Sequence, residues 1–181
     1  MYRFEAEKAE ELISEKRKRI QPIEPFEGVI GSIEDKNTAV DFGAGIGYFT
    51  VPLSKHFKRV FAIEAQEEMA EKLRKRLKML GVENVGIIIS DKPIDFDFEV
   101  SLILFANVLH EVENWRELLE WSRIAKHVIV IDWKKVRTDF GPPLEERIGE
   151  EEMKKVLSEI FKSVKKFDFY KYHYFFLCSN E

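Results

Sequence analysis

The sequence predicts an α/β fold, with a mostly parallel, seven-stranded sheet, helices on both faces and an antiparallel hairpin at the C-terminal end. Short apolar runs typical of strands alternate along the chain with helical segments. Residues 99–105 form one such run, suited to a strand buried on both faces. Near the C-terminus two strand-like runs lie only three residues apart, which indicates the hairpin.

The individual elements follow from local patterns. An N-terminal helix is expected over 4–19, because its apolar residues share one stripe, and Pro22 and Pro25 end it. Strands are expected at 38–42, 59–63, 84–89, 99–105, 128–132, 163–170 and 174–178. Helices are expected at 26–34, 48–57, 66–80, 115–122 and 150–161. Residues 1–181 are expected to form a single domain, in which the N-terminal segment 1–25 is free to act as a lid.

The composition narrows the class of protein. Of the 181 residues, 45% are hydrophobic and 34% charged, which fits a globular chain and excludes disordered classes. Cys178 is the only cysteine, which excludes an intramolecular disulfide, and with four histidines that do not cluster no metal site is expected. No run is apolar enough for a signal peptide or a membrane span, so a cytoplasmic protein is expected. The abundance of Lys and Glu resembles a thermophilic composition.

The net charge of −4 makes nucleic acid an unlikely default partner. One basic run, 72–78, invites an RNA-binding interpretation. It lies on an expected helix whose Met69, Leu73 and Leu77 make a buried stripe, so a solvated face balanced by neighbouring glutamates is favoured.

A glycine-rich turn follows the first expected strand directly. Gly43, Gly45 and Gly47 stand where the chain passes from strand to helix, and such a turn lets a ligand approach the main chain closely. A dinucleotide site would have its third glycine at position 48, but Tyr48 stands there. The spacing therefore argues against a nicotinamide dinucleotide.

Two acids accompany this turn. Asp41 ends the strand before it, where a carboxylate would repel a pyrophosphate but suits a ligand with an ammonium group. Glu64 ends the next strand and can accept two hydrogen bonds from a ribose diol. An N-cap for the helix at Gln66 is the other interpretation of Glu64. A nucleoside that carries an amino acid fits both acids.

The order of these motifs resembles the class I S-adenosylmethionine-dependent methyltransferases, through Asp41-x-Gly43-x-Gly45-x-Gly47, Glu64, Asp91 and Asn107-Val108-Leu109-His110. The resemblance implies a Rossmann-like fold and S-adenosylmethionine as cofactor, with S-adenosylhomocysteine as product. It implies that the loop 41–47 meets the methionine portion, Glu64 the ribose hydroxyls and Asp91 the adenine amino group, with Asn107 beside the sulfonium. Asp95 is the alternative acid for adenine.

Substrate-side residues are expected at the same edge of the sheet. His110 is the histidine at the mouth, where it either takes a proton from the acceptor or bonds to the backbone. Trp133 could wall an apolar pocket or pack in the core. Arg147 could bind a substrate anion, or pair with Glu145, Glu146 or Glu150. The segments 107–110 and 132–147 also resemble small methyltransferases of the ubiquinone and menaquinone biosynthesis type.

These observations predict an S-adenosylmethionine-dependent methyltransferase that acts on a small-molecule acceptor. Two alternatives remain: a non-catalytic partner or regulatory subunit that binds the cofactor, and an RNA or protein methyltransferase. The latter predicts a basic surface at the mouth. The absence of an Asn/Asp-Pro-Pro-Tyr motif after the fourth strand counts against methylation of an amino group on a base or glutamine.

Overall fold

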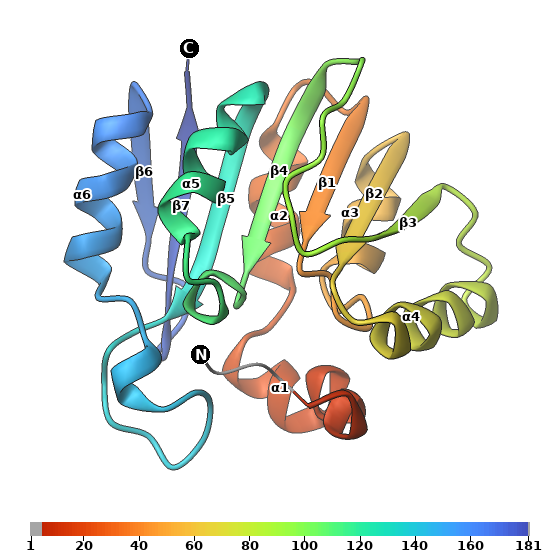
Figure 1. The fold of residues 1–181 in the computed structure, drawn as a ribbon, viewed down its shortest axis with the longest axis horizontal. Helices are drawn as coiled ribbons and strands as arrows, with labels where there is room; N and C mark the ends of the chain where they lie inside the picture. Colours follow the sequence, from red (N-terminus) through yellow and green to blue (C-terminus); the bar gives the residue numbers. More distant parts are fainter. Residues whose placement is uncertain (1–4, 181) are drawn as a thin grey trace.

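Seven strands form one sheet in the order β3-β2-β1-β4-β5-β7-β6 in the computed structural model, which describes residues 5–180 (Figure 1). The strands are β1 Thr38–Phe42, β2 Arg59–Glu64, β3 Val85–Ile89, β4 Val100–Ala106, β5 Ala125–Trp133, β6 Ser163–Phe167 and β7 His173–Ser179. The first five run parallel, and β7 pairs antiparallel with both β5 and β6. The mostly parallel sheet and its C-terminal hairpin are confirmed.

Helices cover both faces of the sheet, as expected. They are α2 Glu24–Ser32, α3 Thr50–His56, α4 Glu67–Met79, α5 Trp115–Trp121 and α6 Glu150–Ile160, with short 3-10 turns η2 Leu109–Glu111, η3 Ser122–Ile124 and η4 Leu144–Glu146. Along β4, Leu102 and Leu104 pack towards α2 and α3, while Ile103 and Phe105 pack towards α5 and α6. The apolar run of β4 thus supplies both cores.

Strand β5 is longer than the five residues expected. Its pairing with β7 continues to the register Trp133↔His173, and this antiparallel ladder extends β5 to the edge where the site lies. The order of the strands places β1 beside β4, so the chain reverses direction across the sheet between these two strands. Ligands of open α/β sheets bind at the carboxyl ends of strands at such a point.

The N-terminal helix expected over 4–19 is wrong as a single helix. A 3-10 helix, η1 Ala6–Ile13, is followed by α1 Glu15–Ile20. Ser14 separates them because its backbone is extended and its hydroxyl accepts the N–H of Arg17 at 3.2 Å, as an N-cap. Residue 4 of this expected helix, and residues 1–4 of the expected lid segment 1–25, lie outside the described residues.

Both N-terminal helices lie at the carboxyl ends of the parallel strands (Figure 1). Ala9 is buried there against Ile46 and Met69. Among residues 5–180, no helix is long and apolar enough to cross a membrane.

Candidate functional site

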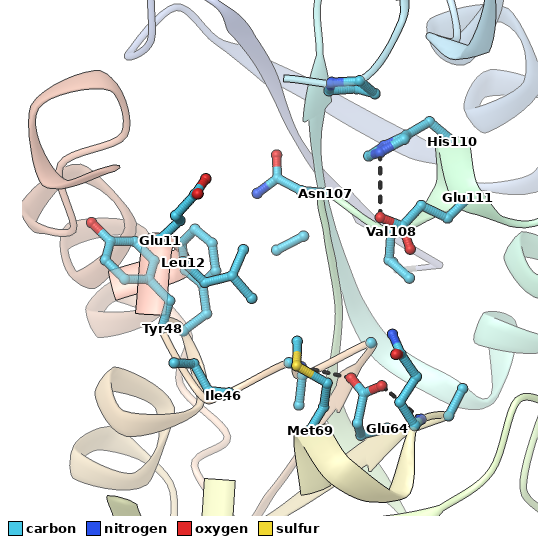
Figure 2. Close-up of a pocket in the computed structure, with 18 of the residues that line it drawn as sticks. Glu11, Leu12, Ile46, Tyr48, Glu64, Met69, Asn107, Val108, His110 and Glu111 are labelled. Carbon is cyan, nitrogen blue, oxygen red and sulfur yellow. Dashed lines mark hydrogen bonds and ion pairs between the residues drawn. The ribbon is translucent and has the colours of Figure 1, made fainter. Parts of the chain in front are cut away.

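A cavity of about 540 Å³ opens at the carboxyl ends of the parallel strands. The loops after β1, β2, β3 and β4 line it, together with Trp133 at the end of β5, and η1 and α1 form one wall (Figure 2). Six of the seven residues predicted for the cofactor lie in this lining, namely Asp41, Gly43, Gly45, Glu64, Asp91 and Asn107. Residues at or just after the carboxyl ends of four different strands therefore meet in one cavity.

The glycines of the loop 43–47 have positive φ. At Gly43 and Gly47 glycine is also required because neighbouring side chains of this chain pack too closely for a Cβ. A Cβ on Gly43 would lie 2.4 Å from Cγ2 of Val108, and one on Gly47 would lie 2.6 Å from Cδ1 of Leu73. The prediction that Gly47 binds the ligand is not supported by its position, because Gly47 is absent from the cavity lining. Gly45 faces Leu12 of η1 across the cavity wall, with its Cβ position 3.1 Å from Cδ1.

Several main-chain N–H groups of this loop already have protein partners. Gly43 and Ala44 both donate to the carbonyl oxygen of Ile63, and Gly45 donates to Glu64. The expectation that a ligand approaches these N–H groups is therefore wrong for these three residues. Gly43 and Gly45 instead leave two positions of the cavity lining without a side chain.

Asp41 is buried beneath the loop and carries a perturbed charge. Its side chain is 2% exposed, and its Oδ2 accepts a hydrogen bond from the Thr50 hydroxyl at 2.6 Å. Burial, helped by the nearby charge of Glu64 and opposed by the Thr50 hydrogen bond, raises the pKa of Asp41 to about 7. A cationic group in the cavity would favour the ionised form of Asp41.

Glu64 holds two loops together at the end of β2. One carboxylate oxygen accepts the N–H of Gly45 at 2.8 Å and the other accepts the N–H of Gln66 at 2.9 Å (Figure 2). Glu64 is not the N-cap of α4, which is Gln66. Its carboxylate does accept a backbone N–H just before this helix, so the N-cap interpretation is confirmed only in that respect. A carboxylate has about four lone-pair positions, so two acceptor positions remain for a diol.

Asp91 lies in the cavity lining and Asp95 does not. Asp91 follows β3 directly and is exposed, at the same side of the cavity as Glu64. The structure therefore favours Asp91 over Asp95 as the acid for an adenine amino group.

Asn107 stands after β4 in the left-handed region, with φ of 57°, where asparagine is among the most tolerated residues. Its Nδ2 donates to Oε1 of Gln21 at 3.0 Å, and its Oδ1 is buried without a hydrogen-bond partner. The backbone carbonyl of Gln21 accepts the hydroxyl of Tyr48 at 2.7 Å. The end of α1 is thereby fixed to the floor of the cavity.

His110 is 7% exposed and forms a close pair with Asp132. Its Nδ1 lies 2.6 Å from Oδ1 of Asp132, and its Nε2 lies 3.7 Å from Oε1 of Glu111 (Figure 2). Asp132 also accepts the backbone N–H groups of His110 and Trp133. The carboxylate thus holds the imidazole in one orientation at the cavity, a contact that the sequence did not single out.

We expect His110 to titrate above its ordinary pKa of about 6.5. Burial opposes the charged ring, but the carboxylates of Asp132 and Glu111 outweigh burial and raise the pKa of His110. Asp132→Asn should lower it, and the stability lost by this variant should be greater at pH 6 than at pH 9. The reason is that a raised histidine pKa stabilises the fold at low pH and ceases to do so as the pH passes the folded pKa.

NMR titration of the histidine rings measures this shift, and His56 on α3 is the internal reference. A His110 midpoint that does not change in Asp132→Asn would contradict the pairing.

Arg147 lies outside the cavity that holds the other predicted residues. Its guanidinium has five N–H groups, and each finds an acceptor in the loop before it. The acceptors are the carbonyl oxygens of Lys134, Val136, Phe140 and Pro142 and the hydroxyl of Thr138. The predicted binding of a substrate anion is therefore wrong, because no N–H remains for it, and these contacts replace the predicted ion pair with a neighbouring glutamate.

Trp133 combines both roles that the sequence left open. It lines the cavity and is largely buried, with its ring centroid 4.1 Å from that of His173. A Cβ on Gly141 would lie 2.8 Å from the Trp133 ring, so this glycine lets the loop fold against the indole. Arg147 and Gly141 together hold that loop, and with it Phe140, at the cavity.

The basic run 72–78 does not line the cavity, and its interpretation as a largely solvated face is supported. Lys72 pairs with Glu68 at 3.1 Å, and Arg74 pairs with Glu71. Two residues of the run stabilise segments that line the cavity. Lys72 donates a hydrogen bond to the carbonyl oxygen of Ala6 in η1, and Arg76 donates one to the carbonyl oxygen of Ile46 in the glycine loop.

The sequence predicts that the N-terminal segment can close over the site, but it does not single out the residues of η1 and α1 that line the cavity. Lys8, Glu11, Leu12, Lys16 and Arg17 all line the cavity. Their charges follow the pattern of an ordinary solvated helix, and the break between η1 and α1 at Ser14 is not apparent from that pattern.

Comparison with known proteins agrees with this geometry. Residues 29–127 match a family model described as ribosomal RNA adenine dimethylase. Over 59 residues the chain is 39% identical to a protein-L-isoaspartate O-methyltransferase of Helicobacter pylori, covering 33% of this chain and 28% of the relative. Over 82 residues it is 29% identical to a probable ribosomal RNA small subunit methyltransferase A of Methanosphaera stadtmanae, covering 45% and 30%. The chain thus spans less than a third of the length of these relatives.

Solved structures extend the likeness over the whole chain. A SAM-dependent methyltransferase from Aquifex aeolicus superposes with a TM-score of 0.85 at 28% identity, covering 99% of this chain and all of that one. The N-terminal domain of EvdMO1 with SAH bound superposes with a TM-score of 0.73 at 14% identity, covering 93% and 85%, which shows the same fold.

Proposed function

The chain belongs to the ribosomal RNA adenine dimethylase family, and so to the class I S-adenosylmethionine-dependent methyltransferases; we propose that it transfers a methyl group and that its acceptor is a small molecule. One observation carries the proposal. A single cavity brings Asp41, Glu64 and Asp91 together with the His110–Asp132 pair. It therefore offers positions for a nucleoside with an amino-acid tail and a proton acceptor beside them.

The residues present fit S-adenosylmethionine. The glycine loop leaves the cavity wall bare beside Gly45, and Glu64 keeps acceptor positions for ribose hydroxyls. Asp41 supplies a buried carboxylate for the cationic end, and Asp91 an acceptor for the adenine amino group. When bound, S-adenosylmethionine supplies an electrophilic methyl group on a sulfonium.

The work of this chain is to position the acceptor and to take its proton. Transfer from a sulfonium needs in-line placement and exclusion of water, and η1 and α1 cover the cavity for that purpose. The pair with Asp132 engages Nδ1 of His110, so Nε2, which lies 3.7 Å from Oε1 of Glu111, is the nitrogen that accepts a proton from the acceptor when the ring is neutral. Asp132 acts as a positioning residue.

A small acceptor is favoured because cofactor and acceptor must share one cavity of about 540 Å³, of which Leu12 and Arg17 form part of the wall. To test this, the protein is incubated with S-adenosylmethionine labelled in its methyl group and with three separate cell fractions: small molecules, RNA and protein. Label in the small-molecule fraction is expected. Label confined to RNA or protein would contradict the small acceptor, and S-adenosylhomocysteine binding without label anywhere would indicate a non-catalytic partner.

An RNA acceptor is the second candidate, because the family model and the Methanosphaera relative are both named for ribosomal RNA. The residues after β4 are Asn107-Val108-Leu109-His110 and lack the Asn/Asp-Pro-Pro-Tyr motif. RNA methylation would therefore need a different arrangement around the target amino group. The labelled RNA fraction is the outcome that would favour it.

The N-terminal segment is proposed to be the lid of this site. It contacts the glycine loop through Leu12 and the end of β4 through Gln21, so a bound cofactor would be enclosed beneath it. We expect S-adenosylhomocysteine to protect the tryptic sites between Lys16 and Arg19 by several-fold. Cleavage at exposed Lys171, in the turn between β6 and β7, is the reference that should not change. Equal cleavage of α1 with and without the ligand would contradict the lid.

A further inference from the structure

Arg17 on α1 is a cation of the cavity wall that has no counter-ion. Its Nε is buried and has no hydrogen-bond partner, and no carboxylate lies within ion-pair distance of its guanidinium among residues 5–180. Its guanidinium lies over the ring of Tyr48, 5.2 Å from the centroid. Burial lowers the pKa of Arg17 to about 10, which leaves the side chain charged at neutral pH.

Arg17 is partly exposed to the cavity, but its Nε is a buried donor without a partner, and proteins normally satisfy such a charged group with a carboxylate or another oxyanion. Asp132 is the carboxylate whose charge acts on Arg17, but it already binds His110 and the backbone N–H of Trp133. Arg147, the other arginine of this region, has no N–H to spare. Among residues 5–180, Arg17 is therefore a cavity-lining cation with a buried N–H group that lacks an acceptor, whereas Lys16 of the same wall is exposed.

Arg17 lies on a different side of the cavity from Glu64 and Asp91, the acids expected to bind the cofactor. It is coupled electrostatically to Tyr48, Tyr170 and Asp132, on the side of β4 and β5 where His110 lies. Glu64 and Asp91 end the strands on the other side of β1. The rings of Tyr48, Trp133 and Phe140 also line the cavity, and Lys16 lies 4.7 Å from the centre of the Phe140 ring.

We propose that Arg17 binds an oxyanion of the methyl acceptor, a carboxylate or phosphate group, and so selects anionic small molecules on the β4–β5 side of the cavity. This inference rests on the proposed function, since it assumes that the cofactor occupies the side of Glu64 and Asp91. The acid side chains Glu11 and Asp139 also line the cavity, so selection depends on the buried, unpartnered Nε of Arg17 rather than on the total charge of the wall.

The test uses the full chain saturated with S-adenosylhomocysteine and three probes that share one ring: benzoate, phenyl phosphate and benzamide. Binding is followed by tryptophan fluorescence, for which Trp133 is the tryptophan of the cavity lining. We expect benzoate, phenyl phosphate or both to bind at least tenfold more tightly than benzamide. The anion that binds more tightly shows whether the site prefers a carboxylate or a phosphate. Arg17→Met should abolish this preference, and Arg17→Lys should retain part of it. Arg19→Met removes an exposed arginine of the same helix that does not line the cavity, and it should keep the preference.

A second arm separates the acceptor from the cofactor. S-adenosylhomocysteine has a carboxylate, whereas 5′-methylthioadenosine lacks the amino-acid portion. Arg17→Met should bind both as the wild type does. If it instead loses affinity for S-adenosylhomocysteine alone, Arg17 serves the cofactor and the proposal is overturned.

Equal binding of acids and amide, or no binding of either acid, would also overturn it. Failure of the wild type to bind S-adenosylhomocysteine would refute the proposed function itself, which is a distinct outcome. If Arg17→Met does not fold, the comparison of Arg17→Lys with Arg19→Met still decides the matter.

Discussion

Asp41→Asn is expected to stabilise the protein at pH 8 and, at the same time, to weaken its binding of S-adenosylmethionine by about tenfold to a hundredfold. The pKa of Asp41 is about 7 in the folded protein because the side chain is buried, whereas in the unfolded chain it is near 4. The folded state therefore binds more protons between these values, and its stability falls as the pH rises from about 4 to 7. An amide removes this penalty, which amounts to at most about 4 kcal/mol at pH 8.

The binding loss follows from the same carboxylate. Its charge is unfavourable in the empty cavity and favourable opposite a cationic ligand, so the amide should bind less tightly and show less dependence on pH. Thermal denaturation at pH 5 and pH 8, with calorimetric titration, measures both effects. Asp35→Asn is the matched control, because Lys126 holds the pKa of Asp35 at about 2. That variant should lose stability at pH 8 and bind the cofactor normally, while a stability loss at pH 8 in Asp41→Asn would contradict this account.

Glu64→Ala should weaken binding of S-adenosylhomocysteine by about 1 to 3 kcal/mol and also destabilise the free protein. Binding weakens because the acceptor positions for the ribose hydroxyls are lost. The fold weakens because the N–H groups of Gly45 and Gln66 lose their partners. The structural role thus adds a stability cost to the binding effect that the sequence predicts.

Glu67→Ala is the control for this variant. Glu67 is an exposed acid in the first turn of α4, three residues from Glu64, and it does not line the cavity. Calorimetry and urea denaturation should find both properties nearly unchanged in Glu67→Ala. A Glu64→Ala protein that binds as the wild type does would remove Glu64 from the cofactor site.

The strands and helices could be predicted because their signals are local. The apolar run of β4, the glycine loop after β1 and the spacing of β6 and β7 each depend on a few neighbouring residues. The acids Asp41, Glu64 and Asp91 could be placed for a related reason, since the carboxyl ends of parallel strands meet at one edge.

The remaining parts of the site depend on contacts between distant residues. Asn107 and Gln21 are 86 positions apart in the chain, and His110 and Asp132 are 22 apart. Nothing in the charged pattern of 15–20 distinguishes Arg17 from its neighbours until α1 is placed against the cavity. The misassignment of Arg147 has the same origin, because its five acceptors are loop oxygens whose positions no sequence pattern reveals.

Isothermal titration of the protein with S-adenosylmethionine and S-adenosylhomocysteine, with NAD and ATP for comparison, tests the cofactor site most directly. We expect micromolar binding of the first pair only, abolished by Gly45→Val, whose side chain would meet Leu12 at the cavity wall. Gly81→Val imposes a similar left-handed strain, with φ of 66° against 56°, in open space, and should bind normally. Binding of NAD or ATP in place of S-adenosylhomocysteine, or equal binding by the two glycine variants, would contradict the assignment of this cavity.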